Sequence, residues 1–218
     1  MTLDGVEILT AGAAAADDAA DGKQAAEEPS LGATEERLLV APAEQLILVD
    51  EHDRAVGVGE KLATHRAGAL HRAFSVFVFD ADRRLLLQRR ARTKYHSAGL
   101  WSNTACGHPR PGEATDAAAR RRLREEMGFD CALRHAFAFV YRAELPGGLC
   151  EHEYDHVFVG EFAGTPAPAA AEVEAWAWVT LPELRRELRA RPERFSYWLR
   201  LLLDGPHWPR LHALVGAA

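Results

Sequence analysis

Residues Gly107 to Phe129 read GHPRPGEATDAAARRRLREEMGF, and this stretch says more about the fold than any other part of the chain. From Gly112 to Glu126 it has no proline and no internal glycine, and it is rich in alanine and arginine, which predicts a helix. Gly128 follows as the glycine that ends the helix. We therefore expect a helix with a loop on either side.

The stretch fits the pattern G-x5-E-x7-R-x-U-x-E-E-x-G-U, where U is a bulky apolar residue. Arg122 and Glu126 are four residues apart and share one helix face, which offers a cation for phosphate and a carboxylate for a hard divalent cation. The alternative is a solvated helix face on which arginines and glutamates only pair with each other. The fixed positions are filled by Gly107, Glu113, Arg121, Leu123, Glu125, Glu126, Gly128 and Phe129.

With these positions filled, the stretch resembles the sequence motif of the Nudix superfamily. One position differs, because Nudix hydrolases carry glutamate where this chain has Arg122. The resemblance implies that, in those hydrolases, the glutamate at this position is part of the metal cluster that activates water. Its replacement by arginine removes a metal ligand and adds a phosphate contact. Simple diphosphate hydrolysis is therefore disfavoured.

Strand patterns flank the helix on both sides. LILVD (46–50) and AVGVG (55–59), separated by a polar turn, predict a hairpin. Further strands are expected at 72–80, 84–90, 135–145, 153–162 and 172–181, and helices at 182–190, with Pro182 in the first turn, and at 195–205. The predicted fold class is mixed α/β (α+β). The resemblance implies a Nudix-type mixed β-sheet packed between helices.

The domain boundaries follow from composition. Residues 1–43 are acidic, and within them residues 11–36 form a low-complexity segment rich in alanine, glycine and acidic residues. We therefore expect residues 1–43 to be a disordered tail. Residues 44–205 form the predicted domain, and 206–218 a C-terminal tail. The net charge of −6 divides into −8 for residues 1–44 and +2 for residues 45–218, which also hold all ten histidines.

Several classes of protein are excluded by the same reading. No run of 18 apolar residues is present, so no membrane span is expected, and the N-terminus has the features of neither a signal nor a transit peptide. The acidic net charge argues against a nucleic-acid partner. Three cysteines, at 106, 131 and 150, have no disulfide-framework spacing, which favours the reducing cytoplasm. We expect a cytoplasmic monomer or weak dimer.

Beyond the helix, WSNTACGHP (101–109), LCEHEYDHVF (149–158) and EKLATHRAGALHRAFS (60–75) resemble the type I isopentenyl-diphosphate isomerases. The resemblance covers residues 44 to 203. Its most specific part is Cys106-Gly107-His108 before a helix with Arg122, combined with Glu151 and Glu153. It implies conversion of isopentenyl diphosphate to dimethylallyl diphosphate, a step of isoprenoid biosynthesis.

The resemblance implies a first metal site of three histidines and two glutamates, namely His65, His71, His108, Glu151 and Glu153. Mixed nitrogen and oxygen ligands suit a roughly octahedral Mn²⁺, or Mg²⁺ or Zn²⁺. Glu151 and Glu153 are two apart on a predicted strand and point to one face, while His152 points to the other. Asp155 shares their parity but matches no ligand position, and we expect it on the strand surface.

A second ion, Mg²⁺, is implied between the substrate diphosphate and Glu126. The residues that match the family's diphosphate contacts are Lys61, Arg90, Lys94 and Arg122. The chain has 3 lysines and 23 arginines, and both lysines of the domain fall at these positions.

The implied reaction protonates an unactivated double bond, passes through a tertiary carbocation and removes a proton from the other side. Cys106 and Glu153 match the family's acid/base pair, Tyr141 a tyrosine that hydrogen-bonds the acid, and Trp198 an indole over the cation. The structural alternatives are a small buried thiol for Cys106 and helix packing for Trp198.

Two other functions compete with an isomerase. A Nudix hydrolase of a nucleoside diphosphate derivative would carry glutamate at position 122 and would not need Cys106. A non-enzymatic metal-binding or interaction domain would lack the acid/base residues, which are all present. The predicted partner is therefore a small allylic or homoallylic diphosphate.

Overall fold

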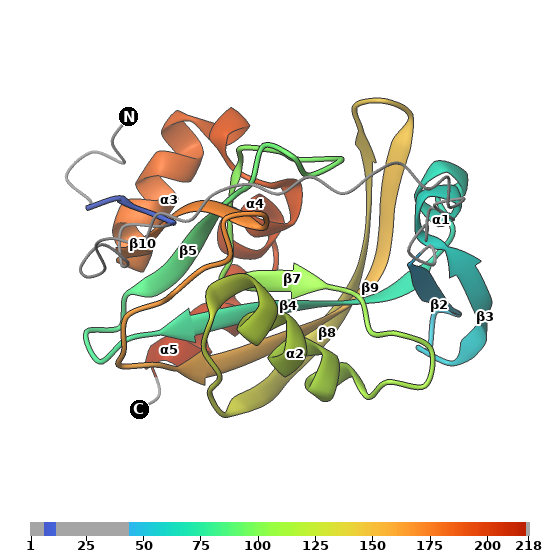
Figure 1. Ribbon diagram of the computed structural model, residues 1–218, viewed down its shortest axis with the longest axis horizontal. Helices are drawn as coiled ribbons and strands as arrows, with labels where there is room; N and C mark the ends of the chain where they lie inside the picture. The colour runs from blue at the N-terminus through green and yellow to red at the C-terminus, as the bar shows by residue number, and fades with distance from the viewer. Residues whose placement is uncertain (1–6, 12–43, 217–218) are drawn as a thin grey trace, which may run out of the picture.

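The computed structural model describes residues 7–11 and 44–216 (Figure 1). Most of the predicted disordered tail, 1–43, therefore lies outside the described residues. Within it, Leu9–Thr10 forms a short strand that pairs with residues 175–176. The strands are β1 (Leu9–Thr10), β2 (Gln45–Val49), β3 (Ala55–Glu60), β4 (His71–Phe79), β5 (Leu85–Arg90), β6 (Trp101–Ser102), β7 (Ala105–Gly107), β8 (Leu133–Leu145), β9 (Leu149–Glu161) and β10 (Val173–Val179).

The sheet is mixed and centres on β4, as Figure 1 shows. β4 runs parallel to β9 over its whole length, in the register His71↔Glu153, and β9 pairs antiparallel with β8. On the other side β5, β10 and β1 continue the sheet, and the predicted hairpin β2–β3 joins one end of β4. The strand β7 pairs with β4 and places Cys106 opposite Ser75.

Three helices form where the sequence predicts them and two were not predicted. The unexpected α1 is begun by the Glu60 carboxylate, which accepts the backbone N–H groups of Leu62 and Ala63, and ends at Gly68 with φ 61°. The other lies within 206–218, which was expected to be a tail, and buries Leu211. No helix of the described ranges is both long and apolar enough to cross a membrane. The helices are α1 (Lys61–Ala67), α2 (Thr115–Met127), α3 (Leu181–Ala190), α4 (Tyr197–Asp204) and α5 (Trp208–Gly216).

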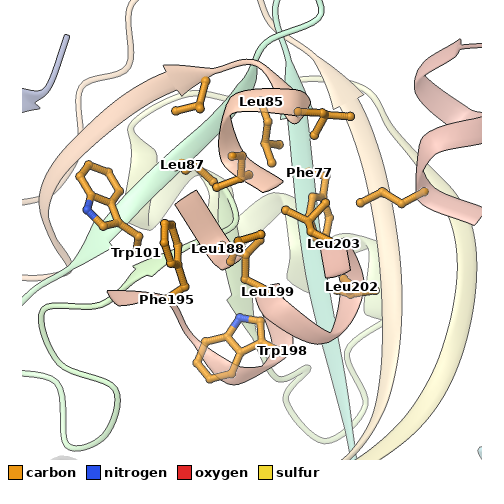
Figure 2. Close-up of a cluster of buried hydrophobic side chains, with 14 of the residues drawn as sticks. Phe77, Leu85, Leu87, Trp101, Leu188, Phe195, Trp198, Leu199, Leu202 and Leu203 are labelled. Atoms are coloured by element: carbon orange, nitrogen blue, oxygen red, sulfur yellow. The ribbon is translucent and has the colours of Figure 1, made fainter. Parts of the chain in front are cut away.

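Both faces of the sheet are covered, which confirms the predicted layers. Alternate residues of β4 point to opposite faces, so Phe74 packs with α2 while Phe77 packs with α3, α4 and α5. Figure 2 shows the second of these cores, in which Trp198 and Leu199 of α4 lie with Phe77. The α2 helix is thereby fixed against β4 and β7, with its polar face directed into a cavity.

Gly128 ends α2 as predicted, with φ 74°. A Cβ at this position would lie 2.1 Å from the carbonyl oxygen of Ala167. Glycine is therefore required here both by the left-handed backbone and by close packing.

Candidate active site

A cavity of about 620 Å³ lies between α2, β7, β9 and α4. It joins segments that are far apart in the chain, because β9 pairs with β4 and α4 packs beneath them. Most of the predicted site residues line it: Lys61, Arg90, Lys94, Cys106, His108, Arg122, Glu126, Tyr141, Glu151, Glu153 and Trp198. The remaining two, His65 and His71, are fully buried beside it.

The predicted metal ligands converge at one end of this cavity. Ligand atoms of His65, His71, His108 and Glu153 all lie within 4.8 Å of one another. Glu151 approaches the same group, with Oε2 3.3 Å from Nε2 of His65. The register His71↔Glu153 between β4 and β9 explains why a histidine and a glutamate 82 residues apart meet.

Backbone carbonyls orient two of the histidines. Nδ1 of His65 donates to the Lys61 carbonyl at 2.7 Å, and Nδ1 of His71 donates to the Ala69 carbonyl at 2.9 Å. In the neutral ring, this hydrogen bond leaves Nε2 free of its proton and directed at the cluster, which is the form that binds metal. Among the described residues, His71 Nε2, His108 Nδ1 and Glu151 Oε2 are buried without a hydrogen-bond partner. Such orphaned atoms and this nitrogen–oxygen set fit a divalent cation.

Glu153 is tied to the cluster and to Tyr141. Its Oε1 lies 3.1 Å from Nε2 of His108, and the Tyr141 hydroxyl donates to its Oε2 at 2.7 Å. Burial alone would raise the pKa of the Glu153 carboxyl, but contacts with His71 and Tyr141 outweigh burial and lower that pKa. Glu153 is therefore a carboxylate in the resting protein.

Cys106 and Trp198 lie at another part of the cavity wall. Burial, together with Glu126 and Glu153 and against the charge of Arg90, raises the pKa of the Cys106 thiol to about 12. The thiol is therefore neutral at neutral pH. The indole N–H of Trp198 donates to Ser102 Oγ at 3.0 Å and to Asn103 Oδ1 at 2.9 Å, which fixes the ring.

Three of the four predicted diphosphate contacts are already engaged with carboxylates, whereas Arg90 donates to Cys106 Sγ and to the His96 carbonyl. Lys61 Nζ lies 2.8 Å from Glu44, and Lys94 pairs with Glu172. Arg122 reaches Glu172 at 2.9 Å and Glu126 at 2.6 Å. Sequence reasoning missed Glu44 and Glu172, because neither belongs to a motif and each is brought in by a distant segment.

Glu126 is the most fully bonded carboxylate of the site. It is 2 % exposed, with Oε2 accepting from Gln88 Nε2 at 2.6 Å and Oε1 from Arg122. The pairing of Arg122 and Glu126 on one helix turn is the one their spacing predicts. Binding of an ion at Glu126 therefore requires an exchange of partners.

The expectation for Asp155 was wrong. Its side chain is completely buried, and the Ser75 hydroxyl donates to its Oδ2 at 2.8 Å. Burial, followed by the charge of Glu153, raises the pKa of the Asp155 carboxyl well above its ordinary value. His152, by contrast, faces away as predicted, with Nδ1 2.9 Å from the Gly68 carbonyl.

Tyr95 and His96 are site residues that the sequence analysis did not identify. The Tyr95 hydroxyl lies 3.3 Å from His65 Nε2, and His96 Nε2 lies 3.3 Å from Glu151 Oε1. Burial, with the charge of Arg90, lowers the pKa of His96 to about 3, so its ring is neutral. The sequence signal that could have identified them is their position directly after Lys94, a predicted diphosphate contact.

A second hollow of about 960 Å³ lies between α3 and α5. Arginines and Trp208 line it, but none of the predicted site residues does. Size alone does not mark the site, because the catalytic residue types gather in the smaller cavity.

The fold and the cavity beside α2 are those of a Nudix domain. The family model "NUDIX domain" matches residues 69–199, more than half of the chain, and the chain belongs to that family. The crystal structures of DR0079 from Deinococcus radiodurans (TM-score 0.62, 23% identity, 74% of this chain and 98% of that one) and of the MutT protein from Methanosarcina mazei Go1 (TM-score 0.53, 17% identity, 66% and 95%) share the fold.

Curated relatives identify the branch of the Nudix family to which the chain belongs. "Isopentenyl-diphosphate Delta-isomerase 2" of Aromatoleum aromaticum is 59% identical over 161 residues, covering 74% of this chain and 85% of the relative. The Burkholderia multivorans "Isopentenyl-diphosphate Delta-isomerase" is 54% identical over 169 residues, covering 78% and 96%. Within the Nudix domains, the chain thus belongs to the isopentenyl-diphosphate delta-isomerases.

Proposed function

We propose that the chain converts isopentenyl diphosphate to dimethylallyl diphosphate in isoprenoid biosynthesis. One observation carries the proposal: Cys106, Tyr141 and Glu153 line the same cavity as the four predicted diphosphate cations. A hydrolase requires no thiol there, and position 122 holds arginine instead of a metal-binding glutamate. The isomerase names of relatives at 46–59% identity support the same reaction.

The diphosphate is assigned to the wall formed by Lys61, Arg90, Lys94 and Arg122. Their charges at one mouth of the cavity complement a substrate that carries several negative charges. Lys94 and Arg122 share Glu172, and the diphosphate takes the place of that carboxylate when it binds. A Mg²⁺ bound to the diphosphate is assigned to Glu126.

A second divalent cation, Mn²⁺ or else Zn²⁺ or Mg²⁺, is assigned to His65, His71, His108, Glu151 and Glu153. When bound it supplies positive charge that orients the carboxylates and lowers their proton affinity. The orphaned His71 Nε2 and Glu151 Oε2 support this assignment. His65 and His71 contribute by holding their protons on Nδ1, against the carbonyls of Lys61 and Ala69.

Cys106 and Glu153 are assigned the two proton transfers. One proton is added to the terminal methylene carbon, which converts the double bond to a tertiary cation. Another proton is then removed from the carbon adjacent to the carbon that bears the diphosphate. In the resting protein the pair holds one transferable proton, on the Cys106 thiol, and an acceptor carboxylate at Glu153. Tyr141 keeps Glu153 in place through its hydrogen bond.

Trp198 is assigned to the cationic intermediate. Its ring lines the cavity and already attracts the Arg90 guanidinium, 5.4 Å from the ring centroid. The hydrogen bonds of its indole N–H already fix the ring, so the Trp198 side chain does not need to become ordered during the reaction. We assign the protein to the cytoplasm, which its three free cysteines support. A monomer or weak dimer stays a prediction from the sequence.

The test is incubation of the full chain with isopentenyl diphosphate, Mg²⁺ and Mn²⁺ in D₂O. We expect dimethylallyl diphosphate and deuterium uptake into both isopentenyl and dimethylallyl diphosphate. Release of inorganic phosphate without isomer would contradict the proposal in favour of the hydrolase. The matched control is Cys131→Ala, which removes a thiol outside the cavity and should leave turnover unchanged.

A further inference from the structure

His96 lies in the loop between β5 and β6, with its ring turned toward the histidine–glutamate cluster. Its side chain is 9 % exposed, and its ring packs edge-on against Tyr95 at 4.3 Å and Trp198 at 6.1 Å between centroids. Nδ1 lies 3.3 Å from Ser97 Oγ, and its backbone carbonyl accepts from Arg90. These contacts leave Nε2 directed at Glu151.

The two oxygens of Glu151 face two different histidines. His65 Nε2 lies 3.3 Å from Oε2, and His96 Nε2 lies 3.3 Å from Oε1. Both separations exceed the roughly 2.7–2.9 Å of a hydrogen bond between imidazolium and carboxylate. Glu151 Oε2 is moreover buried without a hydrogen-bond partner among the described residues.

Such separations also fit atoms that share a metal ion. With metal–nitrogen bonds of about 2.1 Å, adjacent ligand atoms lie about 3 Å apart and opposite ones about 4.2 Å. The ligand atoms of His65, His96 and Glu151 all lie within 4.8 Å of one another. His65 also belongs to the group with His71, His108 and Glu153, but the two groups do not all lie within 4.8 Å of one another. One ion bound by both groups therefore has to draw His96 and Glu151 toward His65.

We propose that His96 is a further ligand of the divalent cation at this cluster, binding through Nε2 beside His65 and Glu151. This inference rests on the metal site of the proposed function and adds a fourth histidine to it. The ion is then held on the Glu151 side by three groups that carry no proton in the reaction.

The experiment counts imidazole nitrogens on Mn²⁺. The full chain is stripped with a chelator, reloaded with Mn²⁺ alone, and studied by pulsed electron paramagnetic resonance through its ¹⁴N couplings. Wild type is expected to show four coordinated imidazoles and His96→Ala three. His52→Ala, at an exposed histidine, is the matched control and should show four.

A mere hydrogen bond from His96 to Glu151 would give a different result. Metal affinity would fall about 10–100-fold on its loss, but the nitrogen count would stay at three in wild type and variant alike. That unchanged count would overturn the inference and leave the proposed metal site intact. Wild type that binds no Mn²⁺ would overturn both. His96→Gln, measured with circular dichroism, keeps the test decisive if His96→Ala does not fold.

Discussion

The two ends of the cavity to which we assign metal ions differ in how their ligand atoms are engaged. At the histidine–glutamate end, His71 Nε2, His108 Nδ1 and Glu151 Oε2 are buried without hydrogen-bond partners in the described part of the chain. At the α2 end, both oxygens of Glu126 are bonded, to Gln88 and to Arg122. The first end is a preformed site, whereas the second is closed by its own side chains.

This difference separates two kinds of binding. An ion at the histidine–glutamate end gains His71 Nε2 and Glu151 Oε2, which have no hydrogen bond to give up, so it should bind without substrate. An ion at Glu126 must displace Arg122, which is favourable when a diphosphate offers that arginine a new partner. In the proposed function, Mg²⁺ binding at Glu126 is thus linked to substrate binding.

The strongest test at the preformed end is Glu153→Gln, which keeps the side-chain volume but removes the proton acceptor. Turnover should fall by about 10²–10⁴-fold, the usual contribution of a positioned acid or base. The measurement is steady-state formation of dimethylallyl diphosphate, with circular dichroism as a check on folding. Turnover close to wild type would remove Glu153 from the mechanism.

Metal binding without substrate separates the two ends directly. Mn²⁺ at about 100 times its Kd should stabilise the chelator-treated protein by about 2.7 kcal/mol, seen as a rise in Tm. Glu126→Gln should keep this shift, and His71→Ala should lose it. The reverse pattern would show that the α2 end is the preformed one.

Arg122→Gln tests the exchange at the α2 end. We expect kcat/KM to fall about 10–100-fold, because one charge-assisted phosphate contact is lost. The Mn²⁺-induced rise in Tm should remain. A variant with full kcat/KM would show that Arg122 does not contact the diphosphate.

Ser75→Ala tests the buried carboxyl beside the preformed end. Removal of the hydroxyl leaves Asp155 Oδ2 without its 2.8 Å hydrogen bond, which should destabilise the fold by about 1–3 kcal/mol. Urea unfolding measures this loss. Ser97→Ala, in the β5–β6 loop, is the control, with a change below about 0.5 kcal/mol expected.

The preformed end should also bind its ion less well in acid. The charge of Glu151 outweighs burial and raises the pKa of His65 above 6.5. Since the ligand must be neutral, protons compete with Mn²⁺ as the pH falls through that value, and affinity drops by up to about tenfold, 1.4 kcal/mol, per pH unit. Titration calorimetry from pH 8 to 5.5 measures this. An affinity that rises in acid would exclude His65 as a ligand.

Much of the fold was predictable because its signals are local. The α2 helix follows from residues 112–126 and from Gly128, and β4 from a continuous apolar run. The α1 helix was missed because it has seven residues and begins at Glu60, an uncommon cap. The helix α5 was missed because its stability depends on packing of Leu211 against α4.

The direction of a site side chain was predictable for residues on strands, where it alternates along the chain. It was not predictable for residues in loops. Parity placed Glu151 and Glu153 on one face and His152 on the other. It could not show that neighbouring strands bury Asp155, since Ser75 is 80 residues away in the chain. His96 lies in a loop, and loop residues carry no periodicity from which their direction can be deduced.

The parallel pairing of β4 with β9 also sets the order of assembly during synthesis. The histidines of residues 65–108 leave the ribosome before β9, which carries both glutamates, and β9 must insert between β4 and β8. Parallel pairing across about 80 residues is slow, because the loop must close before its contacts form. At the proposed metal site a nascent chain therefore offers an ion only imidazoles until β9 docks, so metal capture would report the closing of the central sheet.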